Sequence, residues 1–84
     1  MAGYTVYILR STKTKRFYIG FTIDIKRRLL EHNSGKVTST KNRGPYEIVY
    51  KEISDSREEA LMRERYFKNM KRELLKRRIN LEQE

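Results

Sequence analysis

Five side chains stand out as groups that could act together in catalysis: Tyr7, Tyr18, Arg28, His32 and Glu64. Phosphodiester cleavage needs groups of these kinds. A base or a water-orienting group prepares the nucleophile, and a cation stabilises the charge that develops on the phosphate. A divalent metal held by a carboxylate neutralises the leaving oxygen. These residue types therefore permit phosphodiester hydrolysis, provided that the fold brings them together.

Several other kinds of site are excluded by composition. The chain has no cysteine, so it has neither a disulfide framework nor a thiolate zinc site. His32 is the only histidine, which excludes a metal site built from several imidazoles. The four glycines are scattered and form no phosphate-binding G-x-x-x-x-G-K-[ST] motif, and no G-x-S-x-G supports a serine triad.

The charge of the chain points to a polyanionic partner. Twenty Lys and Arg residues against eleven Asp and Glu give a net charge of +9 on 84 residues. Such an excess on one small domain favours nucleic acid. No apolar run approaches the roughly 18 residues that span a bilayer. We therefore expect a soluble, cytoplasmic protein without membrane contact, with residues 1–84 forming a single domain.

The first 21 residues predict a β-hairpin. Residues 4–9 and 16–21 alternate apolar and polar side chains, and the basic segment 10–15 separates them. Burying the apolar faces together predicts that Ile8 pairs with Phe17 and Val6 with Ile19. In this register Tyr7 stands directly opposite Tyr18 on the other face. Such pairs are also common as simple sheet stabilisers.

A helix is expected over residues 25–33, with Thr22 or Asp24 as its cap and Ser34-Gly35 at its end. Its helical phase turns Arg28 and His32 toward the sheet margin. An arginine or histidine in such a place is more often an ion-pair or packing residue than a catalyst.

The rest of the chain completes an α+β fold. A polar loop over 36–44 leads to a third strand over 46–53. A second helix begins at Ser56 with an S-x-x-E capping box and runs to about Met70, and a third covers about 70–80. Glu64 lies at the edge of the core-facing stripe of the second helix, where an ion pair with Lys68 is an equally simple role. The expected architecture is a three-stranded antiparallel sheet flanked by helices, in the order β-β-α-β-α-α.

At this point the sequence resembles the GIY-YIG endonuclease superfamily, from Tyr4 to about Ile79. The two name-giving motifs appear as Thr5-Val6-Tyr7 and Tyr18-Ile19-Gly20, with threonine where the first glycine would stand. Three further stretches match in order: Asp24 to Arg28, Glu31 to Gly35, and Arg43-Gly44-Pro45. Glu64 follows within Arg63 to Lys68. The chain looks most like the small stand-alone bacterial branch, which is related to the catalytic domain of UvrC.

The resemblance implies roles for the five side chains. Tyr7 and Tyr18 match active-site tyrosines, one of which serves as general base or positions the attacking water. Arg28 matches the arginine that steadies the phosphate, and His32 a histidine near the site. Glu64 matches the metal-binding glutamate, so that the implied cofactor is one Mg²⁺ or Mn²⁺ ion. Asn80 is only a weak counterpart of the family's late asparagine.

The sequence therefore predicts a metal-dependent endonuclease that hydrolyses DNA, with repair or recombination as the setting and branched or damaged DNA among the substrates to test. Two alternatives stay open: a non-catalytic basic nucleic-acid-binding module, and a subunit of a larger repair complex. Seven basic residues on the helix, the polar loop and the last segment are the expected nucleic-acid contacts: Lys26, Arg27, Lys36, Lys41, Arg43, Lys71 and Arg72.

Overall fold

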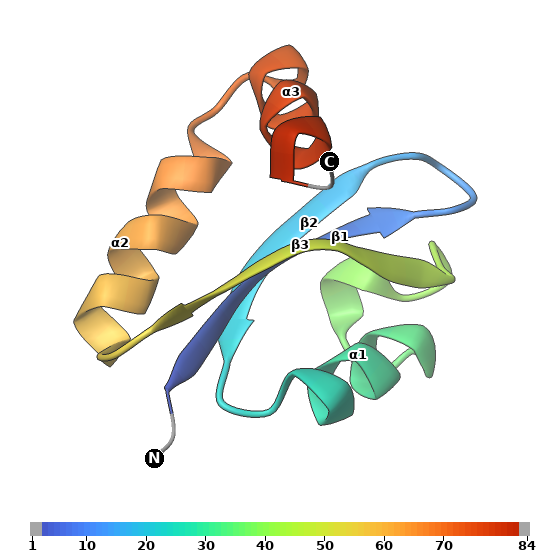
Figure 1. Cartoon of the computed structure of the whole chain (residues 1–84). Coiled ribbons are helices and arrows are strands. Elements are labelled where there is room, and N and C mark those ends of the chain that lie inside the picture. The colour runs from blue at the N-terminus through green and yellow to red at the C-terminus, as the bar shows by residue number, and fades with distance from the viewer. Residues whose placement is uncertain (1–2, 83–84) are drawn as a thin grey trace.

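The computed structural model describes residues 3–82, and its architecture confirms the predicted fold class. The elements are β1 (Tyr4–Ser11), β2 (Phe17–Thr22), α1 (Ile25–Asn33), the short 3-10 turn η1 (Thr38–Thr40), β3 (Tyr46–Ser54), α2 (Arg57–Lys68) and α3 (Arg72–Glu82). The three antiparallel strands lie in the order β2-β1-β3. Figure 1 shows α1 on one face of this sheet and α2 with α3 on the other.

The central strand β1 is buried on both faces because helices cover both sides of the sheet. Val6 and Ile8 pack with Ile19 and Phe67 in the core beneath α2 and α3. On the opposite face, Tyr7 and Leu9 form a smaller cluster with Tyr46, against which Ile25 and Leu29 of α1 pack. The two faces of the sheet therefore differ: one carries the main apolar core, and the other carries the aromatic cluster and the histidine.

The predicted hairpin register is wrong by two residues. Ile8 pairs with Ile19, Leu9 with Tyr18 and Tyr7 with Gly20. Tyr7 is therefore diagonal to Tyr18 rather than directly opposite. A shift of two residues leaves every side chain on its expected face, because side chains along a strand alternate with a period of two. The apolar pattern fixes the faces, but it does not distinguish these two registers.

The hairpin turn selects the observed register. The strands extend until Ser11 N–H donates to the carbonyl of Arg16 at 2.9 Å, which leaves a loop of residues 12–15. The Ser11 hydroxyl accepts hydrogen bonds from the backbone of Lys13 and Thr14 at 3.1 and 2.9 Å. Lys15 has a φ of 65°. This side-chain-supported turn is tighter than the six-residue turn expected from the sequence.

The helix starts follow their capping residues. Asp24 caps α1 by accepting from Arg27 N–H at 3.1 Å, and Ser56 caps α2 by accepting from Glu59 N–H at 3.1 Å. At the other end of α1, Asn33 bonds both backbone groups of Tyr46, at 2.7 and 3.2 Å, and so fixes this helix to the start of β3. The predicted α1 is confirmed, with the same bounds.

The bounds predicted for the last two helices differ from those observed. Helix α2 ends at Lys68 and α3 begins at Arg72, with a turn around Met70 between them. Met70 N–H bonds the carbonyl of Phe67 at 3.1 Å, which tightens the chain after α2. The capping pattern located the start of α2, but its end at the C-cap Asn69 was missed, because asparagine is a weaker stop signal than glycine.

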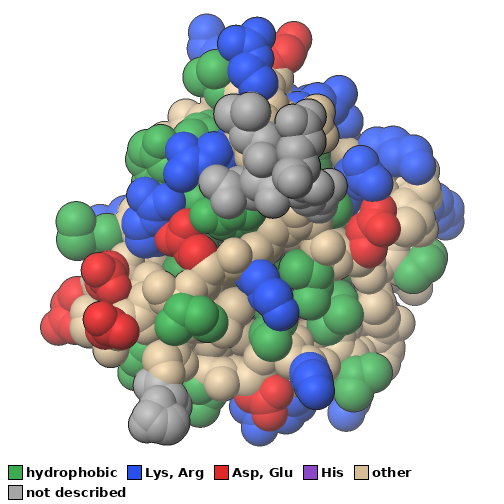
Figure 2. Space-filling view, in the orientation of Figure 1, with side chains coloured by type: hydrophobic (Ala, Val, Ile, Leu, Met, Phe, Trp, Pro, Cys, Tyr) green, Lys and Arg blue, Asp and Glu red, His purple; other side chains and the backbone are tan. Residues whose placement is uncertain are grey.

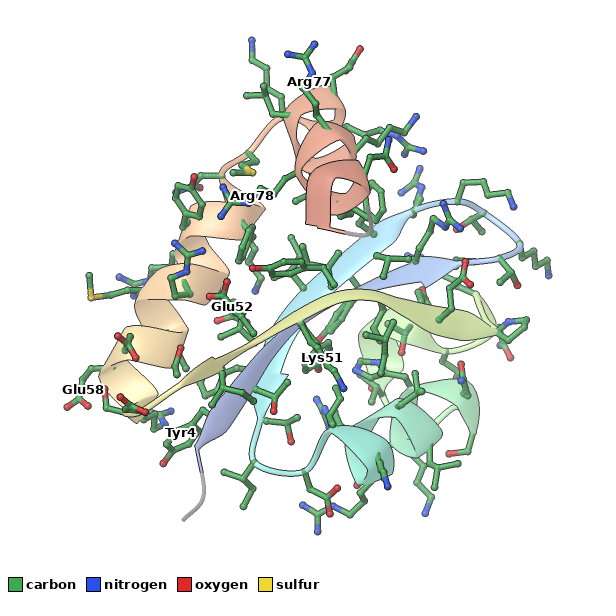
Figure 3. The ribbon with its side chains drawn as sticks, in the orientation of Figure 1. Tyr4, Lys51, Glu52, Glu58, Arg77 and Arg78 are labelled. Carbon is green, nitrogen blue, oxygen red and sulfur yellow. The ribbon has the colours of Figure 1, made fainter. Side chains whose placement is uncertain are left out.

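An ion pair joins β3 to α2 on the main-core face. Glu52 accepts from Arg63 Nε at 2.6 Å and from its terminal nitrogen at 3.0 Å. Figure 3 shows Glu52 on the side of β3 that faces α2. Among residues 3–82, no helix is long and apolar enough to cross a membrane.

Candidate active site

Tyr7 stands at the centre of the candidate site, and the sheet positions it. It lies on the central strand with only 1% of its surface exposed. Its ring leans over Gly20 of the outer strand β2: a Cβ atom added at Gly20 would lie 2.7 Å from the Tyr7 hydroxyl. The absent side chain of Gly20 is therefore what lets the phenol reach toward the β2 edge.

His32 reaches the phenol from α1. Its Nε2 lies 3.1 Å from the Tyr7 hydroxyl, and its Nδ1 lies 2.8 Å from the hydroxyl of Thr40. Only 2% of the His32 surface is exposed. The Tyr18 ring lies 4.7 Å from the imidazole and 6.5 Å from the Tyr7 ring, measured between centroids. The structure thus gathers both tyrosines and the histidine into one cluster, as the helical phase predicts.

Arg28 faces the same cluster from one turn earlier in α1. It makes a polar contact with the Tyr7 hydroxyl, which raises the pKa of the guanidinium. It also donates to Glu31 at 3.0 Å. About a third of the Arg28 side chain, 36%, stays exposed. The arginine is therefore held in place and still open to a ligand on one side.

The environment keeps both central groups neutral near pH 7. Burial raises the pKa of the Tyr7 phenol, and the contact with Arg28 opposes that rise only in part. Burial, followed by the positive charge of Arg28, lowers the pKa of His32 from its usual 6.5. A protonated phenol thus lies beside an uncharged imidazole, which is an arrangement suited to proton transfer between them.

Glu64 approaches from the other side of the sheet. It belongs to α2, and its side chain is 15% exposed and paired with Lys68 at 3.2 Å. The expected (i, i+4) pair is therefore present. The Glu64 charge contributes to raising the pKa of Tyr7, so the carboxylate lies within electrostatic reach of the phenol. Glu64 and Tyr7 can approach each other although they lie on opposite faces, because β2 is an edge strand and side chains from either face can reach that edge.

The donor set at this edge fits one hard divalent cation. No group of three or more acidic, histidine or cysteine side chains that could hold a metal exists among residues 3–82. Magnesium does not need such a group, because one carboxylate with water and phosphate oxygens completes its octahedral shell. The partly exposed Glu64 carboxylate is the side chain that could supply that single protein oxygen ligand, whereas both ring nitrogens of His32 already have hydrogen-bond partners.

Two residues of the candidate site, Thr40 and Glu31, were not predicted from the sequence. The sequence indicated only a polar loop over 36–44, but within it η1 buries Thr40 to 1% exposure against His32. Glu31 had no expected role in the site, yet it pairs with Arg28 at 3.0 Å. The (i, i+3) spacing of Arg28 and Glu31 was a usable signal. No sequence signal indicated the contact between Thr40 and His32, since it depends on how the loop folds back over α1.

The seven basic residues expected to contact nucleic acid are all exposed, but they do not form one continuous patch by element. Lys26 and Arg27 lie on α1, three others lie in the loop between α1 and β3, and Lys71 with Arg72 lies at the start of α3. Figure 2 shows Lys and Arg side chains spread over α3 and the hairpin, with acidic ones gathered near the start of α2. Asn80 lines a separate pocket beside the hairpin rather than the tyrosine cluster.

Known proteins resemble this chain over most of its length. Residues 3–80 match the family model described as the GIY-YIG catalytic domain. A UPF0213 protein of Syntrophus aciditrophicus is 45% identical over 69 residues, covering 80% of this chain and 78% of that protein. A UPF0213 protein of Staphylococcus saprophyticus is 36% identical over 74 residues, covering 87% and 89% of the two chains.

A solved structure gives the same fold. The solution NMR structure of the UPF0213 protein from Bacillus halodurans superposes with a TM-score of 0.61 at 34% sequence identity. The match covers 94% of this chain and 84% of that one. It supports the arrangement of three strands and three helices described above.

Proposed function

Because the chain belongs to the GIY-YIG catalytic domain family, a nuclease-type family that binds nucleic acid, we propose that it is a metal-dependent endonuclease that hydrolyses DNA phosphodiester bonds. One observation carries this proposal. A buried Tyr7 phenol lies 3.1 Å from a neutral imidazole, with Arg28 in contact with the same hydroxyl. A tyrosine hydroxyl can both donate and accept hydrogen bonds, and here its two partners are a base and a cation.

In the proposed reaction, a water molecule attacks the phosphorus while Tyr7 and His32 remove its proton. The water oxygen forms a bond to phosphorus, and the bond from phosphorus to the leaving ester oxygen breaks. The water proton passes to the Tyr7 oxygen as the phenol proton passes to Nε2 of His32. Its raised pKa keeps the Tyr7 phenol protonated, so Tyr7 cannot accept the water proton unless it gives up its own. The neighbouring imidazole accepts that phenol proton.

Thr40 orients the imidazole for this transfer. Its hydroxyl donates to the carbonyl of Val37 at 3.4 Å and can then accept from Nδ1–H of His32 at 2.8 Å. With the proton on Nδ1, Nε2 has a free lone pair that faces the phenol. The loop thus fixes the imidazole tautomer that the transfer requires.

Arg28 and Glu64 complete the site. The guanidinium of Arg28 stabilises the negative charge that develops on the phosphate oxygens. Glu64 would hold the Mg²⁺ or Mn²⁺ ion, which when bound supplies charge neutralisation at the leaving oxygen. Tyr18, whose ring lies against the imidazole, would bound the space for the attacking water. A cytoplasmic location and a role in repair or recombination belong to this proposal too.

The test is a cleavage assay on supercoiled and branched DNA with Mg²⁺ or Mn²⁺. Wild type is compared with Arg28→Ala and Glu64→Ala, with folding checked by circular dichroism. The proposal expects nicked or linear product from wild type and a loss of at least about a hundredfold in each variant. Equal cutting by all three proteins would contradict it.

One observation favours a second candidate, a binding module without catalysis. Arg28 and Glu64 already have internal partners, Glu31 at 3.0 Å and Lys68 at 3.2 Å. Such pairs could serve the fold alone. This candidate predicts salt-dependent DNA binding that survives Tyr7→Phe and Glu64→Ala, with no cleavage in either metal.

A further inference from the structure

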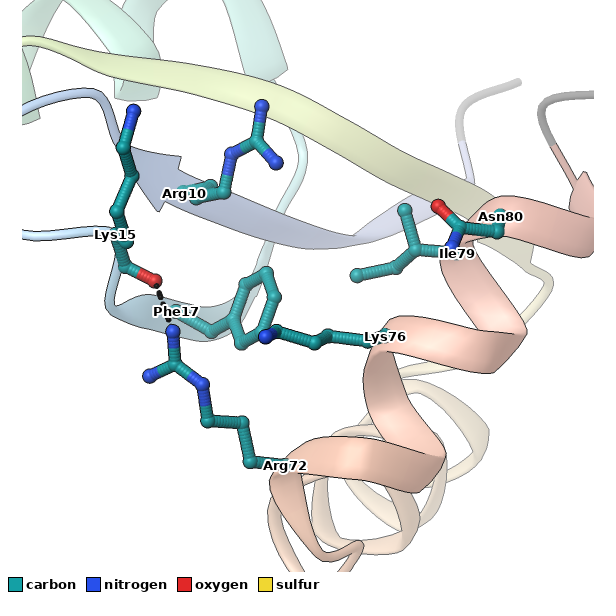
Figure 4. A pocket seen from close by; sticks show the side chains of 7 residues that line it. All are labelled: Arg10, Lys15, Phe17, Arg72, Lys76, Ile79 and Asn80. Atoms are coloured by element: carbon teal, nitrogen blue, oxygen red, sulfur yellow. Dashed lines mark hydrogen bonds between the residues drawn. The ribbon is translucent and has the colours of Figure 1, made fainter.

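A basic pocket that the proposed chemistry does not use lies between the hairpin and α3. Its volume is about 350 Å³, and four cationic side chains line it: Arg10, Lys15, Arg72 and Lys76. Phe17 and Asn80 also face it. Figure 4 shows Arg72 and Lys76 of α3 reaching toward the Phe17 ring, with the Lys15 backbone carbonyl beside Arg72, while the Lys15 side chain and the Arg10 guanidinium extend away from the ring.

Two of the four cations, Arg10 and Arg72, are held in place by contacts within the protein. Arg72 donates to the carbonyl of Lys15 at 3.1 Å, and its guanidinium lies 5.6 Å from the centroid of the Phe17 ring. Residues 72, 76 and 80 recur every four positions along α3, which places them on one face. The guanidinium of Arg72 is therefore fixed before any ligand arrives, which lowers the cost of binding.

Most of this positive charge has no internal counterion. Arg10 is neutralised by Glu47 at 2.6 Å. Within residues 3–82, Lys15, Arg72 and Lys76 form no ion pair with an acidic side chain, and no acidic residue lines the pocket. Arg72 and Lys76 lie on either side of the Phe17 ring and repel one another in the free protein, so an anion with several oxygens would relieve that repulsion.

The pocket continues into a groove that leads toward the tyrosine cluster. This second hollow, of about 530 Å³, follows the edge of β2 and shares Phe17 and Arg72 with the basic pocket. Tyr18 and Lys68, the partner of Glu64, line its other part. Arg16 also lines this groove and contributes a further positive charge. One connected surface thus runs from the candidate active site to the basic pocket.

We propose that the basic pocket binds the phosphodiester backbone of the substrate strand, beyond the bond that is cut, as that strand follows the β2 edge. The identity of the strand as DNA rests on the proposed function. Lysine ammonium groups and an arginine fork are the side chains that contact phosphate most often. The pocket thereby gives this small chain a second point of attachment that sets the direction of the strand.

The experiment compares Lys15→Gln/Lys76→Gln with a control, Lys51→Gln/Arg77→Gln, that removes the same charge elsewhere. Lys51 lies on β3, and Arg77 lies on α3 directed away from the pocket (Figure 3). Binding of a labelled DNA duplex is followed by fluorescence anisotropy over a range of salt, with EDTA present to prevent cutting. Inorganic phosphate and a mononucleotide are tested as competitors.

The pocket variant is expected to bind DNA roughly tenfold more weakly than the control, with a salt slope smaller by about one to two contacts. Amide NMR signals of Phe17 and Asn80 should shift on adding DNA to wild type. Equal loss of affinity in the two double variants, or unshifted signals, would overturn the proposal. So would saturation of the pocket by phosphate or mononucleotide without displacement of DNA, since the site would then serve small anions.

Cleavage distinguishes failure here from failure of the proposed function. If DNA binding depends on the pocket but wild type never cuts DNA, the inference about the pocket stands and the endonuclease proposal fails. If wild type cuts DNA and both double variants bind and cut alike, the endonuclease proposal stands and the inference about the pocket fails.

Discussion

The Tyr7 hydroxyl lies 3.1 Å from Nε2 of His32, although 25 positions separate the two residues in the chain. One residue comes from the central strand and the other from the last turn of the helix that covers it. Both are almost fully buried, and each has a second polar partner, Arg28 for the phenol and Thr40 for the imidazole. Arg28, Tyr7, His32 and Thr40 therefore form one connected series of polar contacts, with the bond between Tyr7 and His32 at its centre.

Replacing Tyr7 by phenylalanine removes one oxygen and leaves the ring. We expect the single-turnover cleavage rate to fall by about 10² to 10⁴, because the proton path from water to His32 is interrupted. The free energy of unfolding should change by only about 1 kcal/mol. Tyr4→Phe on the same strand is the matched control, since Tyr4 packs against Phe21 on the opposite face. A similar rate loss in both variants would argue against a role for Tyr7 in the chemistry.

Gly20→Ala tests the placement of the phenol. The added methyl would lie 2.7 Å from the Tyr7 hydroxyl and 2.9 Å from the ring carbon that carries it. The ring must move, so we expect cleavage to fall by about a hundredfold and unfolding to become easier by roughly 1–3 kcal/mol. NMR spectra should show shifts at Tyr7, Tyr18 and His32. An unchanged His32 spectrum with full activity would contradict this assignment of Gly20.

The pH dependence of cleavage follows from the lowered pKa of His32. Neutral imidazole accepts the phenol proton, so activity should decline on the acid side with an apparent pKa below the usual 6.5. The unfolded chain takes up a proton near pH 6.5 while the folded chain does not, so stability is full above that pH and falls as pH drops toward the folded pKa. Because the chain has one histidine, its single ring-proton NMR titration measures the folded value directly. A value at or above 6.5 would contradict the prediction.

Thr40→Val removes the hydrogen-bond partner of Nδ1 with little change in shape. We expect the imidazole to lose its fixed tautomer, which nitrogen-15 chemical shifts of His32 report directly. Cleavage should fall about tenfold, and leaving Nδ1 buried without a partner should cost about 1–3 kcal/mol of stability. Thr40→Ser keeps the hydroxyl and should restore both the tautomer and most of the rate. Identical behaviour of the valine and serine variants would show that Thr40 acts through packing alone.

Glu64→Gln tests the metal site apart from activity. Mn²⁺ is expected to broaden the amide signals around Glu64 and the nearby tyrosines in wild type, and to broaden them much less in the variant. Glu58→Gln on the first turn of the same helix is the control, since Glu58 points away into solvent (Figure 3). Broadening that is the same in wild type and Glu64→Gln would place the ion elsewhere.

The sequence by itself determined which face each residue of the hairpin occupies and which side of α1 carries Arg28 and His32. Alternating apolar residues put Tyr7 and Tyr18 on one side of the sheet, and the 3.6-residue helical repeat turned Arg28 and His32 toward them. Capping residues located the starts of α1 and α2. These features follow from local periodicity, which depends on neighbours only a few positions apart.

Only the tertiary structure decided the hairpin register, the Thr40 contact and the position of Glu64. Registers that differ by two residues bury the same side chains, so the turn formed by Ser11 and Lys15 had to choose between them. Thr40 meets His32 because a loop without periodicity folds back over α1. Glu64 comes within electrostatic reach of Tyr7 across the outer strand β2, from a helix packed on the opposite face of the sheet. Each of these relationships joins segments distant in the chain, and their free energy depends on packing that no single segment encodes.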